Sequence, residues 1–104
     1  MAPDLIRVAV LGSTGSVGEQ ALDVVRRLNE RTPGRMQVVA LAAGNNAGRL
    51  REQALEFHPS AISCRPGRDA DALRAETHAA WQTLDELATR DNVDVVLVAT
   101  SGLA

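Results

Sequence analysis

The feature that most constrains this chain is a glycine-spaced turn, G-S-T-G-S-V-G, at residues 12–18. An apolar, β-branched run from Ile6 to Leu11 precedes it and predicts a strand buried on both faces, as parallel strands are. Helical periodicity begins within it, at Ser16. Glycines at this spacing let the backbone turn sharply, let a ligand come close and let the next helix pack tightly on the strand. The turn therefore predicts a loop that holds phosphate on the free N–H groups at a helix start.

The first helix should be followed by a second buried strand. We expect the helix to end near Asn29, because T-P-G at 32–34 is a turn signal and the residue before a proline is disfavoured in the α region. Residues Met36 to Ala43 predict the strand, so residues 6–43 form a βαβ unit with parallel strands. The buried stripe of the helix is expected to consist of Val17, Ala21, Val24 or Val25, and Leu28.

The rest of the chain continues the alternation of helices and strands. A helix is expected after Asn46, its N-cap, and before Pro59. The later elements are expected to be a short strand at Ala61–Cys64, a polar helix at Asp69–His78, a short helix at 84–88 behind a Thr83/Glu86 capping box, and a strand at Val93–Thr100. The predicted fold class is α/β, a Rossmann-type parallel sheet with helices on both faces. Residues 1–104 would be one dinucleotide-binding domain, truncated at Ala104.

Composition excludes several classes of function. The 104 residues carry a net charge of -2, and every basic residue is Arg. This balance, without charge blocks, argues against a nucleic-acid surface and a polybasic membrane anchor. No apolar run approaches the length of a membrane span and the N-terminus does not resemble a signal peptide, so a cytoplasmic protein is expected. Cys64 is the single cysteine, which excludes an internal disulfide and predicts a small buried hydrophobe rather than a nucleophile.

Glycine spacing alone also occurs in purely structural turns between a strand and a helix. Here the strand before it and the amphipathic helix after it favour nucleotide binding over that alternative. A P-loop is excluded, because it needs a Lys where this chain has Glu19.

The loop after the second strand selects between the two nicotinamide cofactors. A carboxylate there would bind a ribose 2′-hydroxyl and repel a 2′-phosphate. This chain has Gly44, Asn45 and Asn46 instead, which favours NADP. Arg49 and Arg51 could pair with the 2′-phosphate or could lie on a solvated helix face. Asn46 could serve as a cap, as a ribose-phosphate contact, or as both.

Other chemistry-bearing residues lack a motif. His58 and His78 have no metal-ligand spacing and are expected in loops or at helix ends. Trp81 is expected to cover an edge of the core. Ser101 and Gly102 follow the last predicted strand, where they could contact a cofactor or form a plain turn.

Three segments carry a family resemblance. They are V-L-G-S-T-G-S-V-G with the downstream L-D-V-V, V-V-A-L-A-A-G-x-N after the second strand, and the E-Q-A-x-E-F-x-P that follows. Together they resemble the N-terminal domain of 1-deoxy-D-xylulose 5-phosphate reductoisomerases over Leu5 to Ala104. The resemblance implies an NADPH-dependent oxidoreductase of the non-mevalonate isoprenoid pathway, which isomerises and reduces its sugar phosphate to 2-C-methyl-D-erythritol 4-phosphate.

The resemblance also implies site residues. Thr14, Gly15, Ser16 and Val17 would hold the pyrophosphate of NADPH. Gly44, Asn45 and Asn46 would hold the adenosine ribose and its phosphate. The family usually has Lys or Arg where this chain has Asn45, so Arg49 or another arginine would have to substitute, or the selectivity for NADPH is weakened.

The rest of the implied enzyme would lie beyond Ala104. The ligands of a divalent cation, Mg or Mn, the catalytic residues and the C-terminal domains belong there, so no catalytic or metal residue is assigned in this chain. The partners implied are the sugar phosphate and a second copy in a homodimer, with no nucleic acid and no membrane. Two alternatives are a non-catalytic nucleotide-sensing module and the cofactor half of a short-chain dehydrogenase, whose catalytic Tyr and Lys are both absent here.

Overall fold

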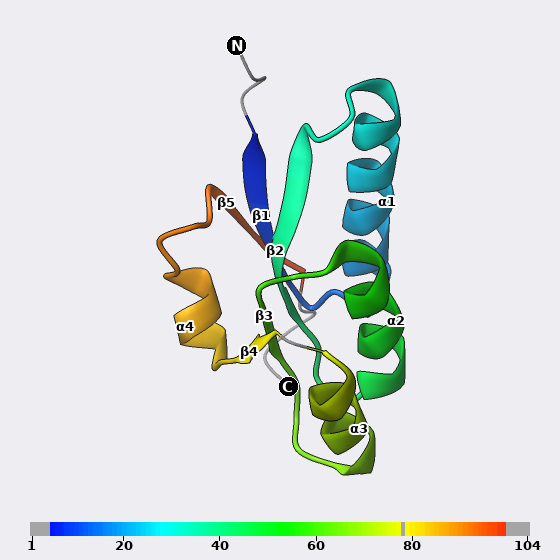
Figure 1. Cartoon of the computed structure of the whole chain (residues 1–104), viewed down its shortest axis with the longest axis vertical. Helices are drawn as coiled ribbons and strands as arrows, with labels where there is room; N and C mark the ends of the chain where they lie inside the picture. Colours follow the sequence, from blue (N-terminus) through cyan, green and yellow to red (C-terminus); the bar gives the residue numbers. More distant parts are fainter. Residues whose placement is uncertain (1–4, 78, 100–104) are drawn as a thin grey trace.

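Strands and helices alternate along the chain, and the strands form one parallel sheet (Figure 1). A computed structural model of the chain describes residues 5–77 and 79–99. The elements are β1 (Ile6–Leu11), α1 (Ser16–Arg31), β2 (Met36–Ala42), α2 (Ala47–Phe57), β3 (Ala61–Ser63), α3 (Arg68–Glu76), β4 (Ala80–Trp81), α4 (Leu84–Ala88) and β5 (Val95–Val98).

The order of the strands in the sheet is β4-β3-β2-β1-β5. From β1 the chain steps outward through β2, β3 and β4, and then crosses back to place β5 on the other side of β1. The strand order therefore reverses at β1. In open parallel sheets this switch point opens a crevice at the carboxyl ends of the strands, where ligands bind.

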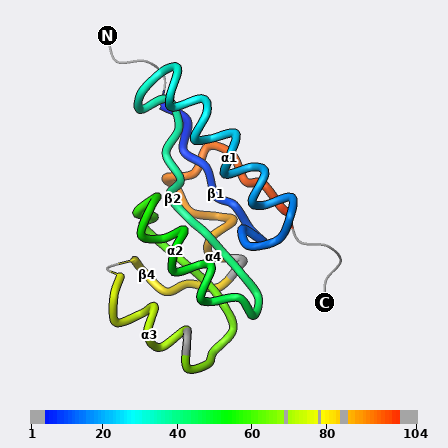
Figure 2. The backbone as a smooth tube through the Cα atoms, turned by 90° about the vertical axis from the view of Figure 1, so that its right-hand side faces the viewer, coloured from blue at the N-terminus to red at the C-terminus, as the bar shows by residue number. Residues whose placement is uncertain are grey.

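Helices cover both faces of the sheet, as predicted (Figure 1). Leu22 of α1, Leu50 of α2 and Leu73 of α3 share one core cluster with Val8 and Val10 of β1. Figure 2 looks onto this face, with α1 and α2 in front of β1 and β2. The opposite face packs against α4, whose Leu87 lies in a second cluster made largely of alanines. β1 is buried from both sides because successive side chains of a strand point to opposite faces.

The predicted buried stripe of α1 is right at Val25, one of its two alternatives, and wrong at Val17 and Leu28. The helix buries Gly18, Leu22 and Val25, whereas Val17 and Leu28 are exposed. The physical reason is the close approach of Gly18 to the backbone of Gly12 and Ser13, because this contact sets the rotation of α1 about its axis.

Several boundaries also differ from the predictions. α1 continues to Arg31, β3 ends at Ser63, and β4 was not predicted at all. The last strand begins at Val95 rather than Val93, because the Val93 N–H bonds back to the Arg90 carbonyl at 3.3 Å in a turn. The predicted capping box at α4 is confirmed, since the Glu86 N–H donates to Thr83 Oγ1 and the Thr83 N–H to Glu86 Oε1. His78, Thr100, Ser101, Gly102 and Ala104 lie outside the described residues.

Candidate nucleotide-binding site

The glycine turn and the loop after β2 lie side by side at the carboxyl edge of the sheet. Leu11 and Ala42, the last residues of β1 and β2, are partners in the parallel ladder. The N–H groups of Gly12 and Ser13 both donate to the Ala42 carbonyl at 2.8 Å. The two segments that the sequence assigns to the cofactor are therefore joined directly, next to the switch point of the sheet.

Two glycines of the turn are required by the fold itself. Gly12 has φ of 91°, a conformation that side-chain-bearing residues rarely adopt. A Cβ on Gly18 would lie 2.1 Å from the Gly12 carbonyl oxygen. Gly18 thus lets α1 begin against the turn, which is the close helix packing expected of the third glycine of such a fingerprint.

Gly15 is different, because the fold does not require a glycine there. Its backbone is extended, with φ of -78°. A Cβ would meet the Gly12 oxygen at 3.6 Å, an ordinary contact. Gly15 is the N-cap of α1 and no side chain caps this helix. The first N–H groups of a helix have no partner within it, so they are directed at an exposed surface that has no Cβ at Gly15.

Helix α2 begins in the opposite way, with a capped first turn. Asn46 Oδ1 accepts a hydrogen bond from the Arg49 N–H at 3.1 Å, which confirms Asn46 as the N-cap. Gly44 and Asn45, before it, are exposed. A Cβ on Gly44 would find no atom within 4 Å, so the loop is open on this side.

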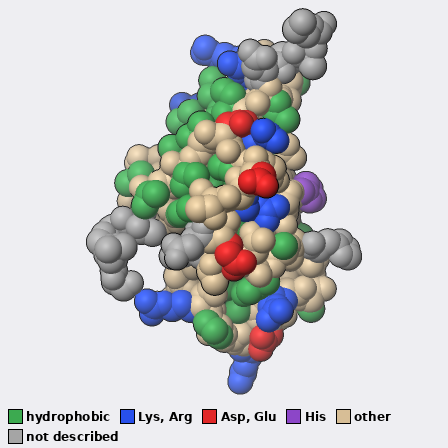
Figure 3. All heavy atoms as spheres, turned by 90° about the vertical axis from the view of Figure 1, so that its left-hand side faces the viewer, with side chains coloured by type: hydrophobic (Ala, Val, Ile, Leu, Met, Phe, Trp, Pro, Cys, Tyr) green, Lys and Arg blue, Asp and Glu red, His purple; other side chains and the backbone are tan. Residues whose placement is uncertain are grey.

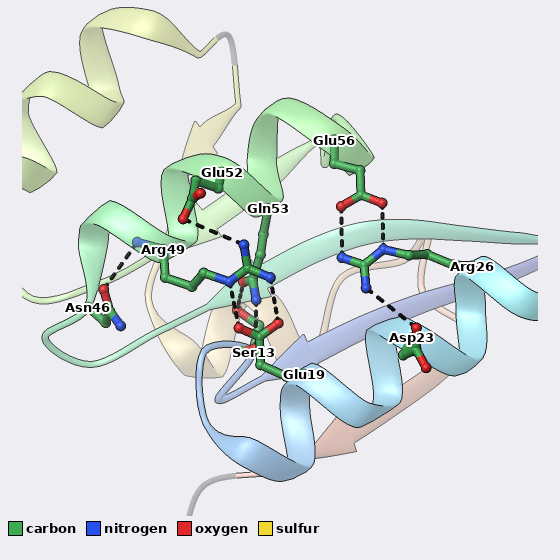
Figure 4. Close-up of polar contacts among 9 residues, drawn as sticks. All are labelled: Ser13, Glu19, Asp23, Arg26, Asn46, Arg49, Glu52, Gln53 and Glu56. Atoms are coloured by element: carbon green, nitrogen blue, oxygen red, sulfur yellow. Dashed lines mark hydrogen bonds and ion pairs between the residues drawn. The ribbon is translucent and has the colours of Figure 1, made fainter.

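Both arginines that the sequence offers for a 2′-phosphate are paired with carboxylates. Figure 4 shows the Arg49 guanidinium on Glu19 of α1, with Nε 2.5 Å from Oε2 and Nη2 2.9 Å from Oε1. Glu52 also contacts Arg49, at 3.5 Å. Arg51 pairs with Glu76 of α3 at 2.5 Å, away from the glycine turn. Arg49 would have to leave or share Glu19 in order to bind a phosphate.

The Arg49 pair changes the ionisation of Glu19. Hydrogen bonding from Arg49 lowers the pKa of Glu19 below its ordinary value of 4.5. The carboxylate near the start of α1 is therefore ionised at neutral pH, and its charge is balanced by the arginine.

Sequence reasoning missed two residues at this edge. Gln53 of α2 is fully buried and bonds to Ser13 of the glycine turn. The sequence feature that could have identified Gln53 is its position as a polar residue between Leu50 and Ala54, on the apolar stripe of α2. Arg65 follows β3, and its N–H donates to the Gly44 carbonyl at 3.0 Å, which places a third loop beside Gly44 and Asn45.

The remaining candidates lie elsewhere. His58 is the left-handed C-cap of α2, with φ of 52°. Trp81 covers an edge of the larger core, as predicted, with the Arg74 guanidinium 5.0 Å from its ring centroid. Cys64 is partly buried against the same core, and this burial raises the pKa of its thiol.

A cavity of about 540 Å³ lies at the opposite, amino edge of the sheet, lined by residues that include His58, Ser60 and Thr77. It contains none of the predicted cofactor residues. Within residues 5–77 and 79–99, no group of three His, Cys, Asp or Glu side chains is placed to hold a metal ion. No helix in those ranges combines the length and the apolar character needed to cross a bilayer.

Fold and site together define a class of protein, the Rossmann-type domains that present a glycine turn at the switch point of a parallel sheet. The family profile of 1-deoxy-D-xylulose 5-phosphate reductoisomerase matches residues 8–104. The chain belongs to this family.

Individual relatives carry the same family name. The reductoisomerase of Anaeromyxobacter sp. (strain K) is 45% identical over 102 residues, which cover 92% of this chain and 25% of the relative. That of Nitrosomonas europaea is 38% identical over 106 residues, covering 93% and 25%. The chain thus spans about a quarter of the length of these relatives. Membership of this family excludes the alternative that the chain is the cofactor half of a short-chain dehydrogenase.

Solved structures of reductoisomerases also resemble this chain in fold. A crystal structure of DOX-P reductoisomerase with magnesium superposes with a TM-score of 0.75 at 29% identity, over 88% of this chain and 24% of that one. A second, with NADPH, fosmidomycin and magnesium, gives a TM-score of 0.73 at 28% identity, over 88% and 23%.

Proposed function

We propose that the loops after β1 and β2 bind NADPH. Thr14, Gly15, Ser16 and Val17 would hold the pyrophosphate, and the loop at 44–46 would hold the adenosine ribose and its 2′-phosphate. The observation that carries this proposal is the start of α1 at the switch point. It is uncapped, and it carries a glycine, Gly15, that the backbone does not need. An anion would receive hydrogen bonds from the helix N–H groups and would be favoured by the helix dipole.

We further propose that the chain is the NADPH-binding portion of an enzyme that converts 1-deoxy-D-xylulose 5-phosphate to 2-C-methyl-D-erythritol 4-phosphate. Domain 1–104 would hold the cofactor over the carboxyl edge of the sheet, while catalytic and C-terminal domains supply the sugar-phosphate site and the ligands of Mg or Mn. The assembled enzyme would be a cytoplasmic homodimer without nucleic-acid or membrane partners. NADPH supplies the hydride for the reduction when it is bound.

Calorimetric titration of this chain with NADPH and with NADH tests the cofactor assignment. We expect NADPH to bind more tightly, because no carboxylate follows β2 to repel a 2′-phosphate. Equal affinities, or tighter binding of NADH, would contradict the assignment. The chain alone should not turn over the sugar phosphate, and measurable turnover would show that its catalytic groups lie within these 104 residues.

Two arginines are candidates for the 2′-phosphate. Arg49 is closest in sequence to the loop but is held by Glu19, whereas the Arg65 backbone is bonded to Gly44. The variants Arg49→Ala and Arg65→Ala separate them in the same titration. If an arginine binds the 2′-phosphate, its alanine variant should bind NADPH about tenfold more weakly, because a charge-assisted hydrogen bond is lost. The same variant should keep its affinity for NADH. An equal loss for both cofactors would assign that arginine a structural role.

A further inference from the structure

Ser13 and Gln53 form a buried polar pair between the glycine turn and α2. Both side chains are 0% exposed, and among the described residues they are the two buried polar side chains. Ser13 Oγ donates to Gln53 Oε1 at 2.7 Å, and Gln53 Nε2 donates to the Ser13 carbonyl at 2.8 Å (Figure 4). The amide of one glutamine therefore bonds both the side chain and the main chain of one loop residue.

These bonds leave Ser13 little freedom. Its N–H donates to the Ala42 carbonyl at 2.8 Å, so its N–H, its carbonyl and its hydroxyl all have partners within the protein. Thr14 and Gly15, the next residues, begin the segment assigned to the pyrophosphate. The direction of their backbone is set by the peptide plane of Ser13, because each residue adds only two soft torsions.

Helix α2 connects the Ser13–Gln53 pair to the loop at 44–46. It starts at Ala47, directly after Asn46, and carries Arg49 and Gln53 one turn apart on the side that faces α1. Arg49 binds Glu19 of α1 and lowers the pKa of that carboxyl, with a smaller contribution from Gln53. One short helix thus fastens the glycine turn and the start of α1 to the loop at 44–46.

We propose that Gln53 is a positioning residue for the cofactor, which rests on the proposed function of the two loops. Through Ser13 it fixes the glycine turn in the conformation that presents the N–H groups of Thr14, Ser16 and Val17 to the pyrophosphate, while the Gly15 N–H donates to the Gly12 carbonyl. Because Gln53 lies on α2, which begins directly after the loop at 44–46, the two ends of the adenine half of NADPH meet a site of fixed length. Preorganisation of this kind raises affinity, since the loop does not have to be ordered on binding.

The test is a double-mutant cycle on NADPH affinity with Gln53→Met and Ser13→Ala. Methionine fills a similar volume but cannot bond Ser13, so Gln53→Met should weaken NADPH binding by about tenfold. Ser13→Ala should cost less, because the bond to the Ser13 carbonyl stays. In the double variant Ser13→Ala should add nothing to Gln53→Met, since its partner is already gone. Additive losses would overturn the proposal.

Two controls separate positioning from general destabilisation. Gln20→Met makes the same chemical change at an exposed site of α1 and should leave NADPH affinity unchanged. Ile62→Val lowers stability from the buried strand β3, away from the turn. If Ile62→Val weakens NADPH binding as much as Gln53→Met does, Gln53 has only a structural role and the proposal fails.

Amide hydrogen exchange without cofactor makes the test independent of the proposed function. In Gln53→Met we expect faster exchange at Gly12, Ser13 and Gly15, the residues of the turn whose N–H groups are hydrogen-bonded, and unchanged exchange at residues 38–42 of β2. Uniform acceleration, or none, would overturn the positioning role. A local exchange effect together with a wild-type chain that binds no NADPH would contradict the proposed function alone. A wild-type chain that binds NADPH with the same affinity as Gln53→Met would contradict the positioning role alone.

Discussion

The glycines of the turn at 12–18 do three different things, although the sequence presents them as one motif. Gly12 adopts a positive φ, Gly18 makes room for a carbonyl oxygen, and Gly15 does neither. A motif of three glycines therefore contains two residues that serve the fold and one, Gly15, that the fold does not require and that the proposed NADPH site would explain.

Alanine substitutions should separate these roles. Gly18→Ala places a Cβ 2.1 Å from the Gly12 oxygen, so either the turn or α1 must shift. We expect the free energy of unfolding to fall by about 1–3 kcal/mol, as for other overpacked sites. Gly15→Ala should leave this free energy nearly unchanged, because its Cβ makes an ordinary contact, and should weaken NADPH binding.

Urea unfolding and NADPH titration of the same two variants check this. Each variant serves as the control for the other. The interpretation of Gly15 is contradicted if Gly15→Ala keeps the wild-type affinity, and that of Gly18 if Gly18→Ala unfolds at the wild-type urea concentration.

Residue identities explain how much of the site could be predicted. The turn at 12–18 and the cap at Asn46 are local, so spacing and residue type were enough to find them. Gln53 lies 40 residues from Ser13, and no local pattern links the two. The ion pair of Arg49 with Glu19 could not be predicted for the same reason, since it depends on how α1 and α2 are placed together.

Elements α1 and α2 are joined across their surface by two ion pairs. Arg49 binds Glu19 and Arg26 binds Glu56, the latter with Nε 2.6 Å from Oε2. Hydrogen bonds from the arginines lower the pKa of both carboxyls below 4.5. All four side chains are 30–44% exposed, so each pair is worth about 0.5–1 kcal/mol at most.

Acid should therefore loosen the contact between α1 and α2. A carboxyl whose pKa is lower in the folded state stabilises the protein above its unfolded pKa and loses this contribution as the pH falls through the folded value. We expect the free energy of unfolding to drop by at most about 1–2 kcal/mol between about pH 7 and about pH 3.5 from these two groups. Urea unfolding at both pH values measures the drop.

The double variant Glu19→Gln/Glu56→Gln isolates this contribution. It should be less stable than the wild type at neutral pH, and its stability should fall less on acidification. Glu86 and Asp94, whose pKa values are also lowered, retain their share of the pH dependence. A double variant with the full wild-type drop would show that the two pairs do not couple the helices.

Element predictions succeeded where burial alone decides the pattern. β1 and β2 are apolar except for Arg7 and Gln37, and both were located almost to the residue. The rotation of α1 was not predictable, because the periodicity of Val17, Val24 and Leu28 competes with that of Leu22 and Val25. β4 has two residues and pairs only at an edge, so it leaves no period to detect.

The molecule as a whole packs its two faces unequally. The face under α1 and α2 is filled by leucines, valines and isoleucine. The face under α4 has alanines along β1 and β2, and its large buried side chains are Leu11 and Leu87. Figure 3 views the side on which α4 lies, where hydrophobic side chains reach the surface between charged ones; Val98 of β5 is 69% exposed.

Leu87 should therefore carry much of the stability of the α4 face. Leu87→Ala leaves a cavity between α4 and a sheet surface of alanines. The sheet cannot move in to fill this cavity, because its strands are fixed by their hydrogen bonds. We expect a loss of about 2–5 kcal/mol in the free energy of unfolding, out of about 5–15 kcal/mol for a domain of this size. Leu55→Ala is the matched control, because Leu55 is 47% exposed on α2 and should change stability by less than about 0.5 kcal/mol. Urea unfolding of both variants measures the difference, and equal midpoints would mean that α4 packs too loosely to stabilise the sheet. A large effect would show instead that this short helix is as necessary to the parallel sheet as α1 and α2 on the other face.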